Sequence, residues 1–218
     1  MNLRNINFIN NPIGFLNNNT INHRWFDEHA QAQGQAPLAE REAVRVMDLA
    51  KFASFDLKPT ATPAQVKFGV VSNQPVMDAP LQGYWCPYRN GNGLPGFVDV
   101  PRRNPDHKFV FTAAMNGCAF IITSSPLGGG YFRVYHHQHP GSAGINALIM
   151  AATPNVITVF PFEEYGNPHA AGLPVAFNFL YYRNGGWVIV SQSTLMVPLT
   201  GVITRDAVMP ILITGANV

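Results

Sequence analysis

Residues 173–183 read LPVAFNFLYYR and residues 186–197 read GWVIVSQSTLMV, and only Asn184 and Gly185 separate the two runs. Both runs are rich in β-branched and aromatic residues, which favour strands. The Asn-Gly-Gly segment between them is a turn signal typical of a β-hairpin. This stretch therefore predicts two long antiparallel strands, and it places the chain in a mostly β class.

The remainder of the chain from residue 65 onward continues the β pattern. Residues 65–71 alternate apolar and polar side chains through Val66, Phe68 and Val70, as in a half-buried strand. Further strand-like runs occupy residues 81–86, 96–100, 108–114, 118–124, 130–136, 155–161 and 208–214. Gly and Pro punctuate nearly every gap. Many short strands with few helices predict an α+β, mostly β fold: a two-sheet β-sandwich core edged by helices and loops.

Two helices are expected outside the strands. The segment PLAEREAVRVMDLAKFASF (37–55) begins with Pro37, a residue suited to a first helical turn. In this helix Val46, Leu49, Ala50 and Ala53 lie on one face, as in an amphipathic helix. A shorter helix is expected over residues 143–151.

The first 35 residues differ in composition from the rest. Asparagine is dense as far as Asn22, and Gln and Ala follow to Gln35. Asn side chains compete for backbone hydrogen bonds and favour turns. We therefore expect residues 1–35 to form a leader or an irregular coat, and residues 36–218 to form one domain.

Composition narrows the class of protein further. Charged residues make up 12% of the 218 residues, and the net charge is +2, which is too small to predict binding to nucleic acid or to an anionic membrane. No run is apolar enough for a membrane span, and no signal peptide is recognisable, so a soluble protein is expected. The two cysteines, Cys86 and Cys118, are interpreted as thiols of a reducing compartment.

Cys118 is the candidate nucleophile. It follows Gly117 between two apolar runs, and the next strand-like run ends in His136, His137 and His139. An imidazole beside a thiol lowers the thiol pKa and supplies a proton. If Phe132 and Val134 face the core, strand alternation places His136 on the same inward face. The other interpretation is that Cys118 is simply a small buried residue.

The words Trp85-Cys86-Pro87-Tyr88, Phe111-Thr112, Gly117-Cys118 and Tyr135-His136 resemble the Burkholderia lethal factor family of toxins. The catalytic fold of that family is shared with the cytotoxic necrotizing factors. The resemblance implies a protein-glutamine deamidase that needs no cofactor, is secreted or injected by a bacterium, and acts in the host cytoplasm. The implied partner is a host protein substrate, either a translation-initiation RNA helicase or a small Rho-type GTPase.

The resemblance also implies roles for particular residues. Cys118 attacks the glutamine amide, His136 moves the protons, and the backbone carbonyl of Thr112 orients the imidazole. Gly117 allows a sharp turn whose N–H groups hold the oxyanion. Because Thr112 acts through its backbone, Thr112→Ala is expected to be mild. Trp85 and Tyr88 form either a pocket rim or part of the core.

Alternatives remain open from the residues themselves. His137 or His139 can replace His136, and the three histidines together can form a metal site, although no carboxylate or thiol lies near them in sequence. The chain can also be a non-enzymatic β-sandwich module that binds a carbohydrate or a protein, with Cys118 as a core residue.

Overall fold

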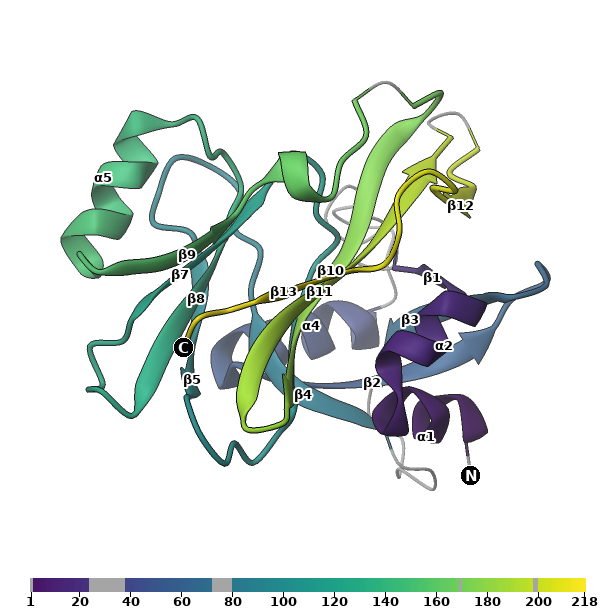
Figure 1. The fold of residues 1–218 in the computed structure, drawn as a ribbon, viewed down its shortest axis with the longest axis horizontal. Helices are drawn as coiled ribbons and strands as arrows, with labels where there is room; N and C mark the ends of the chain where they lie inside the picture. The colour runs from purple at the N-terminus through teal and green to yellow at the C-terminus, as the bar shows by residue number, and fades with distance from the viewer. Residues whose placement is uncertain (1, 24–37, 72–79, 169, 198–199) are drawn as a thin grey trace.

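The computed structural model describes residues 2–23, 38–71, 80–168, 170–197 and 200–218. Two β-sheets form the centre of the molecule, with α5 at one end and α1 and α2 at the other (Figure 1). The prediction of a mostly β fold with two sheets edged by helices is confirmed.

The larger sheet has nine strands. Eight of them follow the order β1-β3-β2-β4-β6-β10-β11-β12, and β13 pairs with β11. Their bounds are β1 (Thr20–Asn22), β2 (Phe52–Pro59), β3 (Gln65–Val70), β4 (Leu81–Cys86), β6 (Phe109–Thr112), β10 (Leu173–Arg183), β11 (Gly186–Met196), β12 (Ile203–Arg205) and β13 (Leu212–Gly215). The hairpin that the sequence predicts is β10–β11, which pairs in continuous register from Leu173↔Met196 to Arg183↔Gly186. Its turn residues, Asn184 and Gly185, both have positive φ, as this type of turn requires.

The smaller sheet has four antiparallel strands in the order β5-β8-β7-β9. Their bounds are β5 (Gly96–Pro101), β7 (Ala119–Ser124), β8 (Tyr131–His137) and β9 (Val156–Phe160). The two sheets pack against each other through apolar side chains that alternate along their strands. In β6, for example, Val110 faces the smaller sheet, while Phe109 and Phe111 face the other way.

Helices cover the outer faces of both sheets. On the larger sheet, an aromatic-rich cluster lies beneath α1 (Leu3–Asn10), α2 (Pro12–Asn18) and α4 (Leu38–Ala50). On the smaller sheet, α5 (Ala143–Ala152) packs through Ile145 and Ile149. A short 3₁₀ turn, Phe162–Glu164, follows β9. Because both sheets are covered on both faces, strands such as β6 are buried at every residue.

The first helix of the sequence analysis is partly wrong. The helix α4 ends at Ala50, and Lys51 adopts a positive φ that leads into β2. In β2 the residues Ala53, Phe55 and Leu57 alternate inward, so residues 52–59 form a strand instead of a helix end. Pro37 lies outside the described residues.

The face of α4 that packs on the sheet differs from the apolar face that the sequence pattern suggests. Val46 and Leu49 are exposed, whereas Met47 is buried and Asp48 accepts a hydrogen bond from Trp85 Nε1 at 2.7 Å. The inward face is therefore rotated by about one residue. It is set by the aromatic cluster and by the indole, which needs an acceptor when it is buried.

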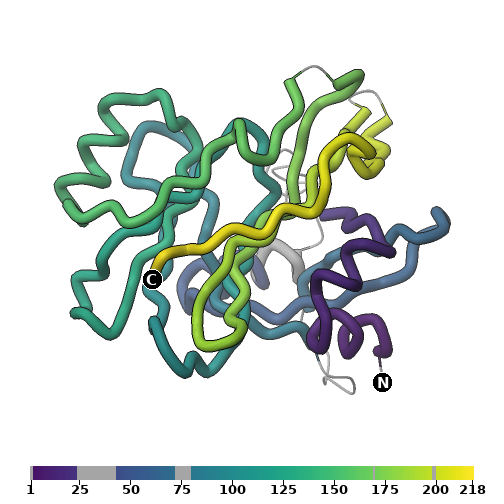
Figure 2. The backbone as a smooth tube through the Cα atoms, in the orientation of Figure 1, coloured from purple at the N-terminus to yellow at the C-terminus, as the bar shows by residue number. Residues whose placement is uncertain are grey.

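The N-terminal residues are regular where the sequence analysis expected turns. The two helices α1 and α2 and the strand β1 occupy residues 3–22, and Phe8, Leu16 and Ile21 are fully buried in the core. The amides of Asn2 and Asn5 donate to Asp56 of β2. Figure 2 shows this segment lying against the part of the chain that contains β2 and β3. The asparagine amides, which were expected to form turns, instead cap the helices and attach them to β2.

Candidate functional site: a closed polar cluster and two open surfaces

The residues singled out by sequence do meet, at the junction of the two sheets. Thr112 ends β6 of the larger sheet, and His136 lies near the end of β8 of the smaller sheet. Phe120 of β7 pairs with His136, and Cys118 lies just before β7 on the same inward face, one diagonal step away. The parity argument that turned His136 inward is therefore correct. We call Cys86, Thr112, Cys118 and His136 the closed cluster.

A hydroxyl links the two sheets within the closed cluster. Thr112 Oγ1 donates to the carbonyl of Cys86 at 2.7 Å and lies 2.6 Å from His136 Nδ1. A hydroxyl has one proton, so Thr112 accepts from the imidazole and Nδ1 carries the hydrogen. The partner of the imidazole is thus the side chain of Thr112, and not its backbone carbonyl as the sequence analysis expected. The expectation that Thr112→Ala is mild loses its basis.

Solvent barely reaches the closed cluster. Cys86 and His136 are fully buried, and Cys118 is 5% exposed. Burial, with a smaller contribution from His137, lowers the pKa of His136 to about 3. Burial likewise raises the pKa of Cys86 to about 12. Both groups are therefore neutral at physiological pH, because water is not available to stabilise their charged forms.

The imidazole makes no hydrogen bond to the candidate nucleophile. Its Nδ1 contacts Thr112, and its Nε2 is buried without a hydrogen-bond partner among the described residues. The backbone carbonyl of Cys118 accepts from the Tyr165 hydroxyl at 2.8 Å. Neither cysteine forms a disulfide. Among the described residues, the Cys118 thiol donates to the carbonyl of Asn116 at 3.7 Å, and no hydrogen bond joins it to His136.

The other residues of the sequence analysis lie around this cluster. Gly117 is exposed with φ +71°, so the predicted sharp turn is present. Trp85 is fully buried in the aromatic core, so it is not part of a pocket rim. Tyr88 is half-buried, and its ring lies edge-on to His136 at 5.1 Å between centroids. Tyr88 therefore covers the imidazole on the side of the β4–β5 loop.

The remaining histidines have separate environments. Strand alternation turns His137 to the face of β8 opposite His136, but α5 covers that face of the sheet, and His137 Nε2 lies 2.8 Å from Asn146 Oδ1. His139 is exposed after the strand. Among the described residues, no group of three or more His, Cys, Asp or Glu side chains is placed to hold a metal ion.

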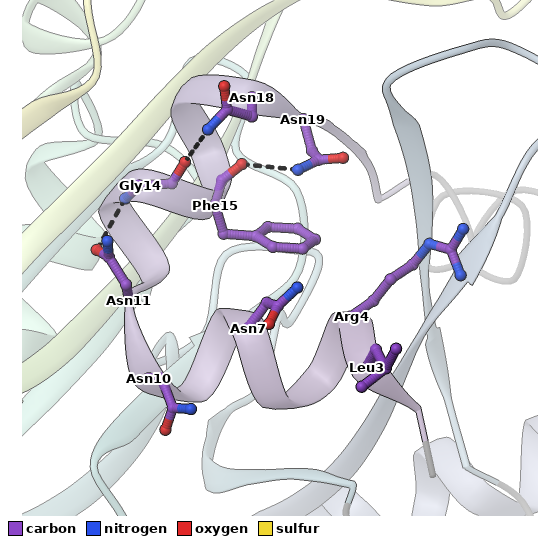
Figure 3. Close-up of a pocket in the computed structure, with 9 residues that line it drawn as sticks. All are labelled: Leu3, Arg4, Asn7, Asn10, Asn11, Gly14, Phe15, Asn18 and Asn19. Atoms are coloured by element: carbon purple, nitrogen blue, oxygen red, sulfur yellow. Dashed lines mark hydrogen bonds between the residues drawn. The ribbon is translucent and has the colours of Figure 1, made fainter.

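An open cavity lies between α1 and α2 (Figure 3), the two helices at the N-terminal end of the molecule (Figure 1). It has a volume of about 630 Å³. Its lining consists of Leu3, Arg4, Asn7, Asn10, Asn11, Gly14, Phe15, Asn18 and Asn19. We call it the amide pocket. The sequence analysis interpreted these asparagines only as turn formers. The high density of asparagine in this segment was the sequence signal for a polar site.

A smaller cavity of about 420 Å³ lies where α4 turns into β2. Lys51 lines it together with Asp99, Asp106 and His107. Burial is the main cause that lowers the pKa of Lys51. The carboxylate of Asp99 is already engaged, because Arg133 Nε and Nη2 donate to it at 2.9 and 2.7 Å.

The second open surface is apolar and was not recognised in the sequence. Leu148 and Met150 of α5 are 42% and 46% exposed, and Val156 and Val159 of β9 are 43% and 51% exposed. Between Pro140 and Pro161 the chain contains no Asp, Glu, Lys or Arg. We call the exposed side of α5 and β9 the α5–β9 face. The absence of charge over this length was the sequence signal for it.

The structure is a mostly β domain of two packed sheets. The closed cluster lies between the sheets, and the amide pocket and the α5–β9 face lie on the surface. The chain belongs to the family described as the Mcf1 activator-binding domain, whose model matches residues 4–196. A search of curated proteins found no match. The matched range begins inside α1 and ends at the last residue of β11, so it includes the N-terminal helices, the whole smaller sheet and the larger sheet except β12 and β13.

This family assignment corrects the resemblance to Burkholderia lethal factor, which was wrong. The short words around Cys118 and His136 reflect how two strands pack in a core, and they do not identify a deamidase. The glutamine deamidase function, and the helicase or Rho-type GTPase as its substrate, are withdrawn with the resemblance. That the chain is an enzyme, and that it acts in a host cytoplasm, stay predictions from the sequence.

None of the helices in the described part of the chain is long and apolar enough to cross a membrane.

Proposed function

We propose that this chain is a protein-binding module that holds an activator protein, and that the α5–β9 face is the surface on which the activator docks. The observation that carries the proposal is the match of the activator-binding family model over residues 4–196. This is the binding-module alternative of the sequence analysis, with a protein as its partner.

The composition of α5 supports a protein contact at this face. Ile145 and Ile149 point into the smaller sheet, yet Leu148 and Met150 on other sides of the helix are also large and apolar. A helix that is apolar all round is normally buried. Large apolar side chains that stay exposed on one helix fit an interaction site, and methionine adapts well to an irregular partner surface.

The position of β9 supports the same face. β9 is the last strand of the smaller sheet and pairs only with β7 among the described strands. An edge strand carries unpaired backbone N–H and C=O groups that can accept another strand. Val156 and Val159 expose apolar side chains beside that edge. The lack of charge from Pro140 to Pro161 fits an activator with an uncharged, apolar contact surface.

The test compares three forms of the biotinylated chain: the wild type, the double variant Leu148→Asp/Val159→Asp, and the control Val208→Asp. Val208 is 78% exposed and lies outside the α5–β9 face. Each form captures proteins from eukaryotic and from bacterial lysates, and the captured proteins are quantified by mass spectrometry. Any candidate is then purified, and its Kd for each form is measured by calorimetry.

We expect a protein that binds the wild type and the control equally and binds the double variant more than tenfold more weakly, because buried charge in an apolar contact is costly. The proposed docking face fails if the purified partner binds all three forms alike. The proposed function fails if no captured protein binds the wild type after purification.

A further inference from the structure

The amide pocket has a chemistry that differs from the rest of the surface. Five of its lining residues are asparagines, and Arg4 is the only charged residue among them. A volume of about 630 Å³ lies within the usual range for ligand sites, roughly 300 to 1,000 Å³. Figure 3 shows Leu3 and Arg4 at one end of the pocket and Asn10 and Asn11 at the other.

The fold uses only part of the hydrogen-bonding capacity of these amides. Asn11 Oδ1 accepts from the Gly14 N–H at 2.9 Å, and the side-chain nitrogens of Asn18 and Asn19 donate to the carbonyls of Gly14 and Phe15 at 2.8 and 3.0 Å. Each amide has two donor hydrogens and an acceptor oxygen. The oxygens of Asn18 and Asn19 therefore remain available to a ligand.

Two further amides have no assigned task in the fold. Asn7 and Asn10 are exposed, and their side chains make no hydrogen bond to other described residues. An asparagine is also a poorer helix former than the alanine, glutamine or lysine that an exposed helix position usually carries. Asn7 and Asn10 therefore lower helix stability, and no hydrogen bond to other described residues offsets this loss.

Elimination narrows the class of ligand. A nucleic acid needs several cations to neutralise its phosphates, and this pocket offers only Arg4. A sugar commonly stacks on an exposed aromatic ring, but Phe15, the only aromatic residue of the lining, is 8% exposed. A ligand that presents alternating N–H donors and C=O acceptors matches the amides best, and an extended peptide main chain is such a ligand.

We propose that the amide pocket binds the main chain of an extended peptide segment from another protein. The extended form is required because a helix has already satisfied its own N–H and C=O groups. Asn7, Asn10, Asn18 and Asn19 contact the peptide backbone, and Arg4 pairs with an acidic side chain at one end of the segment. Binding therefore depends more on the extended conformation of the peptide than on its side chains. It lies at the other end of the molecule from the α5–β9 face, so it goes beyond the proposed docking of an activator (Figure 1).

The experiment uses a library of linear dodecapeptides, selected on the wild-type chain. The Kd of each enriched peptide is measured by fluorescence polarisation against the wild type and against Asn7→Ala/Asn10→Ala. The matched control is Asn17→Ala, because Asn17 is an exposed amide of α2, the neighbouring helix, and does not line the pocket. The peptides are also resynthesised with N-methyl groups at alternate backbone nitrogens. Thermal unfolding shows that each variant is folded.

We expect Asn7→Ala/Asn10→Ala to weaken binding at least tenfold, Asn17→Ala to leave it unchanged, and backbone N-methylation to weaken it more than alanine replacement of the peptide side chains. Replacement of an acidic peptide residue is the one side-chain change expected to matter, and Arg4→Gln removes its effect. The proposal is overturned if no peptide is enriched, or if the enriched peptides bind the double variant as tightly as the wild type.

A glycan array probed with the wild type and the double variant covers the remaining class of ligand. Binding of a saccharide that depends on Asn7 and Asn10 overturns the peptide assignment. None of these measurements uses the activator, so a failure of the amide pocket leaves the α5–β9 docking experiment untouched, and the reverse also holds.

Discussion

The closed cluster and the amide pocket use polar side chains in opposite ways. The closed cluster holds the residue types of an enzyme centre, Cys118, His136 and Thr112, but it lies between two sheets where solvent barely enters. The amide pocket holds uncharged amides of low reactivity, but these line an open cavity, and the fold uses only part of their hydrogen-bonding capacity. Residue chemistry predicts a site only when the side chain is accessible and keeps bonding capacity to spare. The four predictions below test this contrast, and all four are changes in the free energy of unfolding.

The largest effect is expected from pH. In the unfolded chain His136 takes up a proton below its ordinary pKa of 6.5, but in the folded chain burial keeps it neutral until about pH 3. The folded state therefore loses stability as the pH falls through this window. The loss from this residue is about 3 kcal/mol between pH 6.5 and pH 4. Urea unfolding at a series of pH values measures it.

The matched control is His136→Gln, which cannot titrate. We expect the variant to be less stable than the wild type near neutral pH, with a smaller loss on acidification. His137, whose pKa burial also lowers, contributes in the same direction in both proteins. Equal pH slopes in the two proteins would show that His136 is accessible to protons, and the cluster would then not be closed.

The next effect concerns the hydroxyl that links the sheets. Thr112→Val keeps the shape of the side chain but leaves the Nδ1–H of His136 and the carbonyl of Cys86 without their partner. Two buried groups lose a hydrogen bond, so we expect a loss of about 2 kcal/mol in denaturant unfolding. Thr112→Ser retains the hydroxyl and should lose less. A valine variant as stable as the wild type contradicts a structural role for the hydroxyl.

Much of the fold could be predicted from the sequence because its signals are local. The hairpin of β10 and β11 is present with the expected bounds within one residue, since the turn residues and the long alternating runs determine it. The start of β2 was missed because FASFDL follows a helix without Gly or Pro to separate them. Only the pairing with β3 and β4 makes that segment a strand.

The sequence predicted which residues of the candidate site lie near one another, but not how they interact or how deeply they are buried. Strand parity turned His136 inward toward the larger sheet, and Thr112 was chosen as its neighbour. The burial of His136 depends on the contact with Tyr88 and on how closely the two sheets pack. A short sequence motif contains neither kind of information. The open surfaces were missed for the opposite reason, since uncharged amides and apolar helices look like ordinary structure until their exposure is known.

A smaller effect separates the structural amide of the pocket from the others. Asn11 caps α2 by accepting from the Gly14 N–H, so Asn11→Ala should cost about 1 kcal/mol. Asn11→Ser restores a capping oxygen and should recover most of the loss. The comparison is measured as the shift in urea midpoint at constant slope. If alanine and serine are equally destabilising, the cap is not what Asn11 contributes.

The smallest effect is expected at Asn10, and it is the most informative for the amide pocket. Asn10 is exposed at the end of α1 and makes no hydrogen bond to other described residues, so Asn10→Ala should change the free energy of unfolding by less than about 0.5 kcal/mol. Asn17→Ala should behave alike as the control outside the pocket. The two variants then differ only in peptide binding, which Asn10→Ala weakens and Asn17→Ala does not. If Asn10→Ala alone clearly lowers the free energy of unfolding, this amide supports the fold. The amide pocket would then be structural, like the closed cluster, and its amides would not be free for a ligand.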